Sequence, residues 1–574
     1  MGIFAKIDTT QISQVNLQLD NKDAVMDVAS KYAISFKGEL YNREELISLI
    51  DNAALNEKSS DAEIILYGYI SKKEQILELI DGVFAFIIYD KIKEEIFIAR
   101  DHFGVKFIYY FQNDDNLIFA SDIPEILPHV KGELKPNNDV IFDYLVFNRT
   151  DQTENTFFEG IKKFPHGSYA VINNDGFKIT KWYDLTKRVK ETKADKAEFL
   201  SRFENSVSKR LTSDKDWAIC LSGGLDSSAI VSTVVNRLNV GGLHTFSSVY
   251  GKEYEADESK FIEEFKDIVP NMHYIYPTAD MLYENIERLI KSQVEPTPTT
   301  SPYAHYCLLK EAHANGVKIT LDGQGSDETL SGYEYIPGLY HKSLFTHFKW
   351  ITLVKETLKY LKLHRSTRSL KYMLFFMLPS KMRTKVRVSQ RAYVTSEFVR
   401  RHKSSVISEK LYGSKDMQEM LINHFEYKLE HLLKWGERNA TAFNMVSRMP
   451  FLDPKFVEYC IALDDKVKVK NGYTKAILRD SMKGIMPDKV RLRVDKKGFS
   501  IPQEEWFRIE KFQKLVMDIL TSDSFKSRGY IIPEEAIKLY KKHLNGEVNV
   551  SKDIWKWINL ELWFRYFIDT KKSN

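Results

Sequence analysis

The chain has 574 residues, of which 43% are hydrophobic and 28% charged, a composition typical of globular proteins rather than of disordered ones. Lysine and arginine number 83 against 79 acidic residues, so net charge gives no reason to expect a specific nucleic-acid partner. The three cysteines, Cys220, Cys307 and Cys460, are far apart and odd in number. This argues against a disulfide framework or zinc site, and with no run of 18 apolar residues it favours a cytoplasmic protein.

Short apolar segments that alternate with polar residues dominate positions 1–185. Examples are KYAISFKG, GVFAFIIYD, EEIFIAR and GSYAVINN, each bounded by polar turns. A period of two is typical of half-buried strands. We therefore expect a layered, strand-rich domain at 1–185, followed by a polar linker at 186–196.

From residue 197 the pattern changes to strands that lead into helices. The segments DWAICLSGG and LHTFSSVYG are short and apolar, and the first runs directly into the helical stretch SSAIVSTVVNRL. Such alternation favours a parallel sheet of the α/β class. Helical patterns dominate from about residue 340 onward. We expect residues 197–574 to form a parallel α/β domain with a helical C-terminal region.

Positions 341–400 are strongly basic, with 14 lysines and arginines against two acids, Glu356 and Glu397. The net charge of this segment is therefore +12, and that of the rest of the chain is −8. One interpretation is a helical hairpin with a solvated basic face. The other is a surface for an anionic partner, such as a membrane, a lipid-linked diphosphate or a polyanion.

A glycine-rich turn follows the apolar strand WAICL and opens a helix. Gly223 and Gly224 let the backbone approach a ligand, and amides at a helix N-terminus bind phosphate oxygens. Asp226 would repel phosphate, so its presence implies a Mg²⁺ ion between them. The predicted nucleotide-binding residues of this turn are Leu221, Ser222, Gly223, Gly224, Asp226, Ser227 and Ser228.

This turn resembles the SGGxDS loop of ATP pyrophosphatases, and more specifically that of the asparagine synthetase family. Four further blocks resemble the family in the same order along the chain. They are LDGQGSDE at 321–328, NMVSRMPFLD at 444–453, KNGYTKAILR at 470–479 and DKKGFSIP at 495–502. The resemblance covers nearly the whole chain.

The resemblance implies amide formation by adenylation: a carboxylate attacks the α-phosphate of ATP, pyrophosphate leaves, and ammonia or an amine displaces AMP. Asp226 and Asp327 would hold Mg²⁺, and Lys475 would steady the transition state. Asp322 and Gly323 would lie near the adenylate, and Val249 near adenine. For Lys496 and Lys497 two interpretations remain: each contacts phosphate, or each is an ordinary surface charge.

One departure concerns the substrate. Asparagine-forming members carry glutamate where this chain has Gln324, and glutamine cannot act as a base at neutral pH. Gln324 therefore remains a candidate catalytic position, but aspartate as the substrate is in doubt. A cell-surface carboxylate such as a uronic acid is the favoured alternative.

The N-terminal region resembles the family's Ntn-type glutaminase, which implies an αββα sandwich. Its blocks KGELYN at 37–42 and SDAE at 60–63 match, and Glu39 and Asp61 are retained. However, Gly2 stands where active members have the nucleophilic cysteine, and Lys37 replaces the oxyanion-hole asparagine. We expect this half to be inactive, so that the amine comes from free ammonia, a partner glutaminase, a second amine substrate or the substrate itself.

The leading hypothesis is thus an ATP-dependent, AMP-forming amide ligase. A peptide or lactam cyclase of the same family needs no added ammonia and is one alternative. A nucleotide-binding pseudoenzyme is another, although the retained Asp226, Asp327 and Lys475 argue against it. A tRNA-thiolating enzyme is disfavoured because the chain lacks a cysteine pair.

Overall fold

The computed structural model describes residues 3–8, 15–16, 25–173, 176–211, 216–402, 405–495 and 501–572. These residues form two compact units. The first comprises residues 1–137 and 153–188, and the second comprises 138–152 and 189–574. The segment 138–152 thus belongs with the second unit, although it lies within the domain expected at 1–185. The helix α5 (Leu185–Glu191) occupies part of the expected linker.

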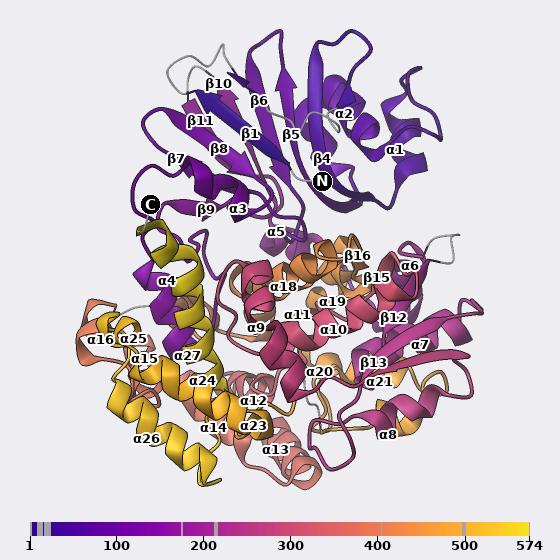
Figure 1. Cartoon of the computed structure of the whole chain (residues 1–574). Helices are drawn as coiled ribbons and strands as arrows, with labels where there is room; N and C mark the ends of the chain where they lie inside the picture. The colour runs from indigo at the N-terminus through magenta and orange to yellow at the C-terminus, as the bar shows by residue number, and fades with distance from the viewer. Residues whose placement is uncertain are drawn as a thin grey trace. The chain divides into compact units, whose positions relative to one another are not determined.

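Two antiparallel sheets form the first unit (Figure 1). One has the strand order β2-β1-β8-β7-β9 and the other β11-β10-β6-β5-β4-β3. The strands are β1 (Phe4–Asp8), β2 (Val15–Asn16), β3 (Val25–Met26), β4 (Tyr32–Leu40), β5 (Gly82–Asp90), β6 (Glu95–Arg100), β7 (Tyr109–Gln112), β8 (Asn116–Ala120), β9 (Ile161–Lys163), β10 (Ser168–Asn173) and β11 (Gly176–Lys181). The helices are α1 (Arg43–Ile50), α2 (Asp61–Lys72) and α3 (Ile123–Ile126).

Alternation along β5 builds two cores, one on each side of its sheet. Phe84, Phe86 and Ile88 pack with residues of α1 and α2. Ala85 and Ile87 pack between the two sheets, against strands such as β1 and β8. Successive side chains of a strand point to opposite faces, so a nearly continuous apolar run is explained by burial on both sides.

The second unit contains a parallel sheet of order β14-β13-β12-β15-β16. The expected parallel α/β architecture is therefore confirmed for this unit. Its strands are β12 (Trp217–Cys220), β13 (His244–Ser248), β14 (Asn271–Ile275), β15 (Ile319–Leu321) and β16 (Val446–Arg448). Side chains of β12 alternate between two cores: Trp217 and Ile219 pack on one face, and Ala218 and Cys220 on the other.

Helices make up most of the remaining second unit, as the sequence predicts (Figure 1). Up to residue 401 they are α4 (Asn138–Phe142), α6 (Phe199–Ser208), α7 (Leu225–Asn236), α8 (Ser259–Ile262), α9 (Ala279–Gln293), α10 (Ser301–Ala314), α11 (Ser326–Leu330), α12 (Ile336–Thr346), α13 (Trp350–His364), α14 (Arg368–Met377), α15 (Ser380–Ser389) and α16 (Ser396–Arg401). The later ones are α17 (Met417–Tyr427), α18 (Leu429–Thr441), α19 (Pro454–Ala462), α20 (Asp465–Lys468), α21 (Ala476–Ser481), α22 (Asp488–Arg491), α23 (Gln503–Trp506), α24 (Glu510–Thr521), α25 (Asp523–Ser527), α26 (Pro533–Leu544) and α27 (Ser551–Trp563). Among the described residues, no helix is both long enough and apolar enough to cross a bilayer.

Candidate active site

The glycine-rich turn connects β12 to α7 in the second unit. Gly223 has a φ of +69°, and a Cβ there would lie 3.0 Å from the Cβ of Phe261, so glycine suits the position. The Oγ of Ser227 accepts a hydrogen bond from the backbone amide of Ser222 (3.1 Å), and the Oγ of Ser222 accepts one from Gly224 (3.3 Å). These bonds fix the turn at the N-terminus of α7, where backbone amides favour an anion.

A second loop follows β15, the strand next to β12 in the parallel sheet. Gly325 has a φ of +87° and ends this loop before α11. A Cβ on Gly323 would lie 3.0 Å from the Cβ of Asp226, so the two loops are in close contact. Both loops leave the carboxyl ends of adjacent parallel strands, which is where α/β sheets place ligands.

Lys475 reaches both loops from a third segment. It precedes α21 with a φ of +52°, and only 2% of its surface is exposed. Its Nζ lies 2.5 Å from Oδ1 of Asp226 and 2.6 Å from Oδ1 of Asp327. It also donates a hydrogen bond to Oγ of Ser326 (3.0 Å), which in turn donates to Asp226 (2.8 Å). Residues distant in sequence thus form one charged cluster.

The same cluster has the donor chemistry of a magnesium site. The two aspartate oxygens converge from different loops, and hard divalent cations prefer carboxylate ligands. Asp327 and Lys475 can approach each other here because residue 332 is a glycine. A Cβ at this position would lie 1.8 Å from Oδ1 of Asp327 and 2.2 Å from Cε of Lys475. Two carboxylates and one ammonium leave the cluster with a net charge of −1. Polyphosphate would be repelled from it without a divalent cation, so the residues fit Mg²⁺.

A cavity of about 730 Å³ opens beside the cluster. Nine of the predicted residues line it: Ser222, Gly224, Asp226, Ser227, Asp322, Gly323, Gln324, Asp327 and Lys475. The other four, Leu221, Gly223, Ser228 and Val249, are not among its lining residues. Val249 is buried in the core beside α7, at the end of β13. Its contact with adenine remains a prediction.

Two arginines that the sequence analysis did not assign also line the cavity. Arg493 donates to the carbonyl oxygen of Gly223 (2.8 Å) and pairs with Glu258 (2.5 Å), so it fixes the glycine-rich turn. Arg479 donates to the carbonyl oxygens of Arg491 and Arg493. Burial lowers the pKa of Arg479 to about 10, which leaves it charged at neutral pH. The sequence could have indicated Arg479, because it stands four residues after Lys475 in the block at 470–479.

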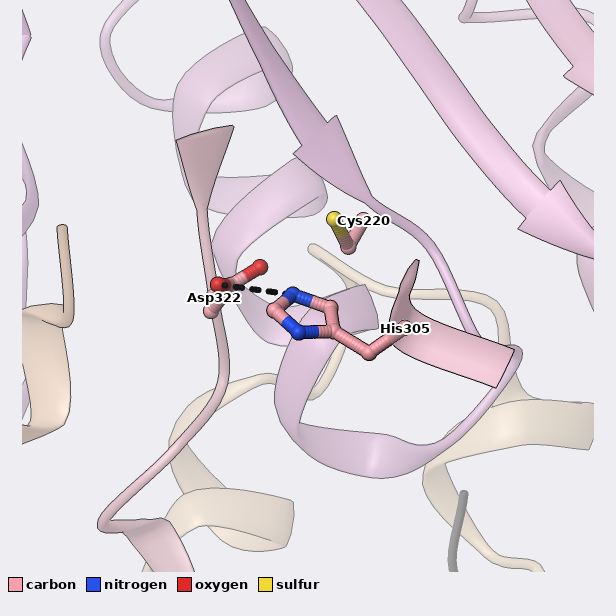
Figure 2. Close-up of side chains that lie close together, drawn as sticks. All are labelled: Cys220, His305 and Asp322. Atoms are coloured by element: carbon pink, nitrogen blue, oxygen red, sulfur yellow. Dashed lines mark ion pairs between the residues drawn. The ribbon is translucent and has the colours of Figure 1, made fainter. Parts of the chain in front are cut away.

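Figure 2 shows a second polar group on the cavity wall, formed by Cys220, His305 and Asp322. Their donor atoms lie within 4.8 Å of one another, and the ion pair from Nε2 of His305 to Oδ2 of Asp322 measures 3.6 Å. Ser447 donates a hydrogen bond to the same carboxylate. Burial alone would raise the pKa of Asp322, but hydrogen bonds from His305 and Ser447 hold it below its usual value.

The thiol of Cys220 decides what this group can do. Burial and the nearby charge of Asp322 raise the pKa of Cys220 well above its usual value, so the thiol stays protonated. A protonated thiol is a poor nucleophile. The arrangement therefore favours a hydrogen-bonded network that keeps the Asp322 carboxylate charged and fixed at the cavity wall.

In the first unit, Asp61 of the glutaminase-like block at 60–63 is engaged by neighbouring residues. Asp61 accepts a hydrogen bond from the backbone amide of Leu40 (3.0 Å) and forms an ion pair with Arg43. Arg43 also donates to the carbonyl oxygen of Ser59 (2.5 Å). Both carboxylate oxygens of Asp61 thus have partners within the unit. Three positions named from the sequence, Gly2, Lys496 and Lys497, lie outside the described residues.

Comparison with known proteins agrees with this architecture. Residues 198–565, more than half of the chain, match the asparagine synthase family, and residues 7–183 match a glutamine amidotransferase domain. Asparagine synthetase [glutamine-hydrolyzing] 1 of Bacillus subtilis is 26% identical over 94% of this chain and 86% of its own length. Asparagine synthetase [glutamine-hydrolyzing] 3 of the same organism is 25% identical over 80% of this chain and 74% of its own. Amidase chyE of Penicillium rubens is 23% identical over 91% of this chain and 84% of its own length. The chain belongs to the asparagine synthase family.

Proposed function

We propose that this protein is an ATP-dependent ligase that adenylates a carboxylate and then forms an amide with ammonia or an amine, releasing AMP and pyrophosphate. The single observation that supports this most is the convergence of Asp226, Asp327 and Lys475 beside a large cavity. Two loops and a buried lysine bring opposite charges together beside this cavity, which supports its assignment as the site for a nucleotide's phosphates.

Each residue has a role that follows from its position. The amides of the turn around Gly224 and the hydroxyls of Ser222 and Ser227 bind the leaving pyrophosphate. Asp226 and Asp327 hold Mg²⁺, which neutralises phosphate charge when bound. Lys475 is fixed in place before the reaction, and a preorganised cation stabilises charge that develops at the α-phosphate.

Gln324 lines the cavity next to this cluster. Its neutral amide can orient an acyl-adenylate by hydrogen bonds but cannot remove a proton from the attacking amine. We therefore propose a carboxylate other than aspartate as the substrate, with a uronic acid as the favoured class. The wall formed by His305 and Asp322 supplies further polar contacts.

The decisive experiment measures AMP and pyrophosphate. Purified protein is incubated with Mg²⁺-ATP and a panel of carboxylates, each with ammonium, with glutamine or with neither. AMP formation with ammonium identifies an amide synthetase, and the carboxylate that responds identifies the substrate. AMP formation with neither identifies an internal amine and hence a cyclase.

Variants connect this activity to the site. Lys475→Met should lower AMP formation about 100- to 1,000-fold, the usual cost of losing one electrostatic contact to a transition state. Asp226→Asn should have a similar effect. Lys483→Met, at an exposed lysine eight residues further along, is the matched control and should leave the rate unchanged. Turnover that survives Lys475→Met would contradict the proposed mechanism, and nucleotide binding without any AMP would favour a pseudoenzyme.

A further inference from the structure

The helix α13 exposes an apolar stripe to solvent. Trp350, Ile351, Val354 and Leu358 lie within about 100° of one another around the helix, and more than half of each side chain is exposed. The opposite face of α13 carries its buried residues, among them Tyr360. The stripe is therefore not the inward face of an ordinary amphipathic helix, which would be covered by the core.

Neighbouring segments also expose large apolar side chains. Of the 18 large hydrophobic side chains that are exposed among the described residues, ten lie between positions 345 and 386. Helix α14 packs against both α12 and α13, and α13 also contacts α12 (Figure 1). We call the ten residues the apolar surface: Phe345, Phe348, Trp350, Ile351, Val354, Leu358, Leu374, Met377, Met382 and Val386. A concentration of this kind marks an interaction site rather than scattered surface residues.

Basic side chains border the apolar surface. On α13, Lys355 and Lys362 lie next to the stripe, and neither forms an ion pair with any described residue. Between positions 345 and 386 the only acidic residue is Glu356, which is buried. The exposed basic residues in this range are Lys349, Lys355, Lys359, Lys362, Arg365, Arg368, Lys371, Lys381 and Lys385.

One helix connects this surface to the candidate active site. Tyr360, Leu363 and His364 of α13 line the cavity, whereas Trp350 and Leu358 on another side of the helix face solvent. A ligand held at the apolar surface would thus lie one helix away from the cavity wall. This bears on where a carboxylate substrate is presented, although the surface itself is independent of the proposed ligase activity.

We propose that α13, α14 and α15 bind the surface of a bilayer that contains anionic lipids. Exposed tryptophan, phenylalanine and leucine enter the boundary between headgroups and acyl chains, and the surrounding lysines contact lipid phosphates. No described helix can cross a bilayer, so the association is peripheral. A second copy of the chain is a poorer occupant, because pairing the same surface would bring nine exposed cations against nine others.

Sedimentation with lipid vesicles tests this directly. The full-length protein should sediment with vesicles of phosphatidylcholine and phosphatidylglycerol, and much less with vesicles of phosphatidylcholine alone. Binding should weaken as salt is raised. Trp350 should give a blue shift in fluorescence on binding, and Trp350→Phe should lose much of that shift while still binding.

Paired variants separate the apolar and basic contributions. Ile351→Glu combined with Leu358→Glu should abolish vesicle binding. The control is Ile92→Glu, which changes another exposed isoleucine, in the first unit, and should bind normally. Changing Lys355, Lys362 and Lys371 to glutamine should weaken binding roughly 100-fold, since each basic residue contributes about a factor of five. The matched control changes Lys538, Lys541 and Lys542 of α26 to glutamine and should have little effect.

Three results would overturn the proposal. The first is no sedimentation with anionic vesicles, and the second is equal binding to neutral ones. The third is a change of oligomeric state caused by the Ile351 and Leu358 variant without vesicles, which would identify the surface as a contact between copies. None of these measurements depends on catalytic activity, so failure here and failure of the ligase proposal can be told apart.

Discussion

At the scale of single residues, the candidate site depends on close approach between charged groups. Lys475 adopts a left-handed backbone conformation before α21, which is uncommon for a residue with a side chain. Its side chain nevertheless reaches Asp226 and Asp327. Gly332 is what leaves room for this arrangement, since any Cβ there would overlap both Asp327 and Lys475.

Gly332→Ala should therefore lower AMP formation about 100-fold, because displacing a catalytic group by about 1 Å can cost that much. The free energy of unfolding should change far less, since the overlap is with two polar side-chain ends at the cavity edge. The two quantities are measured by product formation and by chemical denaturation of the same preparation.

Gly241→Ala is the matched control for this substitution. Gly241 has an ordinary φ, and a Cβ there meets nothing within 4 Å. Its rate should equal that of the unchanged protein. If Gly332→Ala were equally active, the positions of Asp327 and Lys475 could not be as critical as proposed.

Asp143 provides a pH-dependent prediction. Burial raises the pKa of Asp143 to about 7, despite hydrogen bonds from Ser405 and Gln152 that oppose the rise. The folded state therefore binds a proton that the unfolded state has released between about pH 4 and pH 7, so this group destabilises the fold as pH increases. Asp143→Asn removes that loss. Relative to the unchanged protein, its free energy of unfolding should rise by about 2.7 kcal/mol between pH 5 and pH 8, because about two pH units of that interval lie below the folded pKa.

Denaturation curves of both proteins at several pH values check this. Only the difference between them matters, because other groups titrate in both. A difference that stays constant from pH 5 to pH 8 would show that Asp143 is ionised throughout.

At the scale of secondary-structure elements, the periodicity of apolar residues predicted individual strands, whose pattern is local in the sequence. The alternation in GVFAFIIYD predicts β5, and the structure places its two sets of side chains in two different cores. The segment 138–152 shows the limit of this reasoning. Its fixed partners are distant in sequence: Lys556 donates to the carbonyl oxygen of Leu145 (2.8 Å) across 411 residues. No local pattern reports such a pairing.

A buried ion pair anchors this segment to the second unit. Nζ of Lys434 on α18 lies 2.6 Å from Asp151 and 3.0 Å from Glu295, and all three side chains are almost fully buried. Lys434→Met would leave two adjacent carboxylates without their shared cation. We expect a loss of about 3–5 kcal/mol in the free energy of unfolding, the usual cost of breaking a buried pair.

Lys514→Met tests whether lysine loss alone has this effect. Lys514 of α24 is 72% exposed and lies 2.7 Å from Glu510, which is 80% exposed, and exposed pairs contribute little. Its unfolding curve should match that of the unchanged protein. A loss below about 1 kcal/mol for Lys434→Met would show that the two carboxylates are protonated or solvated when the lysine is absent.

At the scale of the whole molecule, the sequence blocks predicted most of the candidate site but not its assembly. The two loops could be predicted because each stands between a strand and a helix. Ser326 lies within the block at 321–328 and Gly332 lies shortly after it, yet their roles depend on contacts with Asp226 and Lys475 that only the folded chain shows. Cys220, His305 and Ser447 belong to three different elements and carry no shared motif, so their network with Asp322 was not predictable.

Two units in one chain also raise the question of where the amine originates. The first unit matches a glutamine amidotransferase domain but contains no cysteine, since all three lie in the second unit and are buried. Lys37 stands where an oxyanion donor is expected, and Arg43 already pairs with Asp61. We propose that the first unit, which has no cysteine nucleophile and whose Asp61 is engaged, does not hydrolyse glutamine.

We therefore expect ammonium, but not glutamine, to support AMP formation, and no glutamate to be released under any condition. Asp61→Asn should leave ammonium-dependent turnover unchanged, because the residue would have only a structural role. Glutamate release is measured alongside AMP with ammonia removed enzymatically, so that contaminating ammonia cannot imitate glutamine use. Glutamate formed in proportion to AMP, and lost in Asp61→Asn, would show that the first unit hydrolyses glutamine by a mechanism that needs no cysteine.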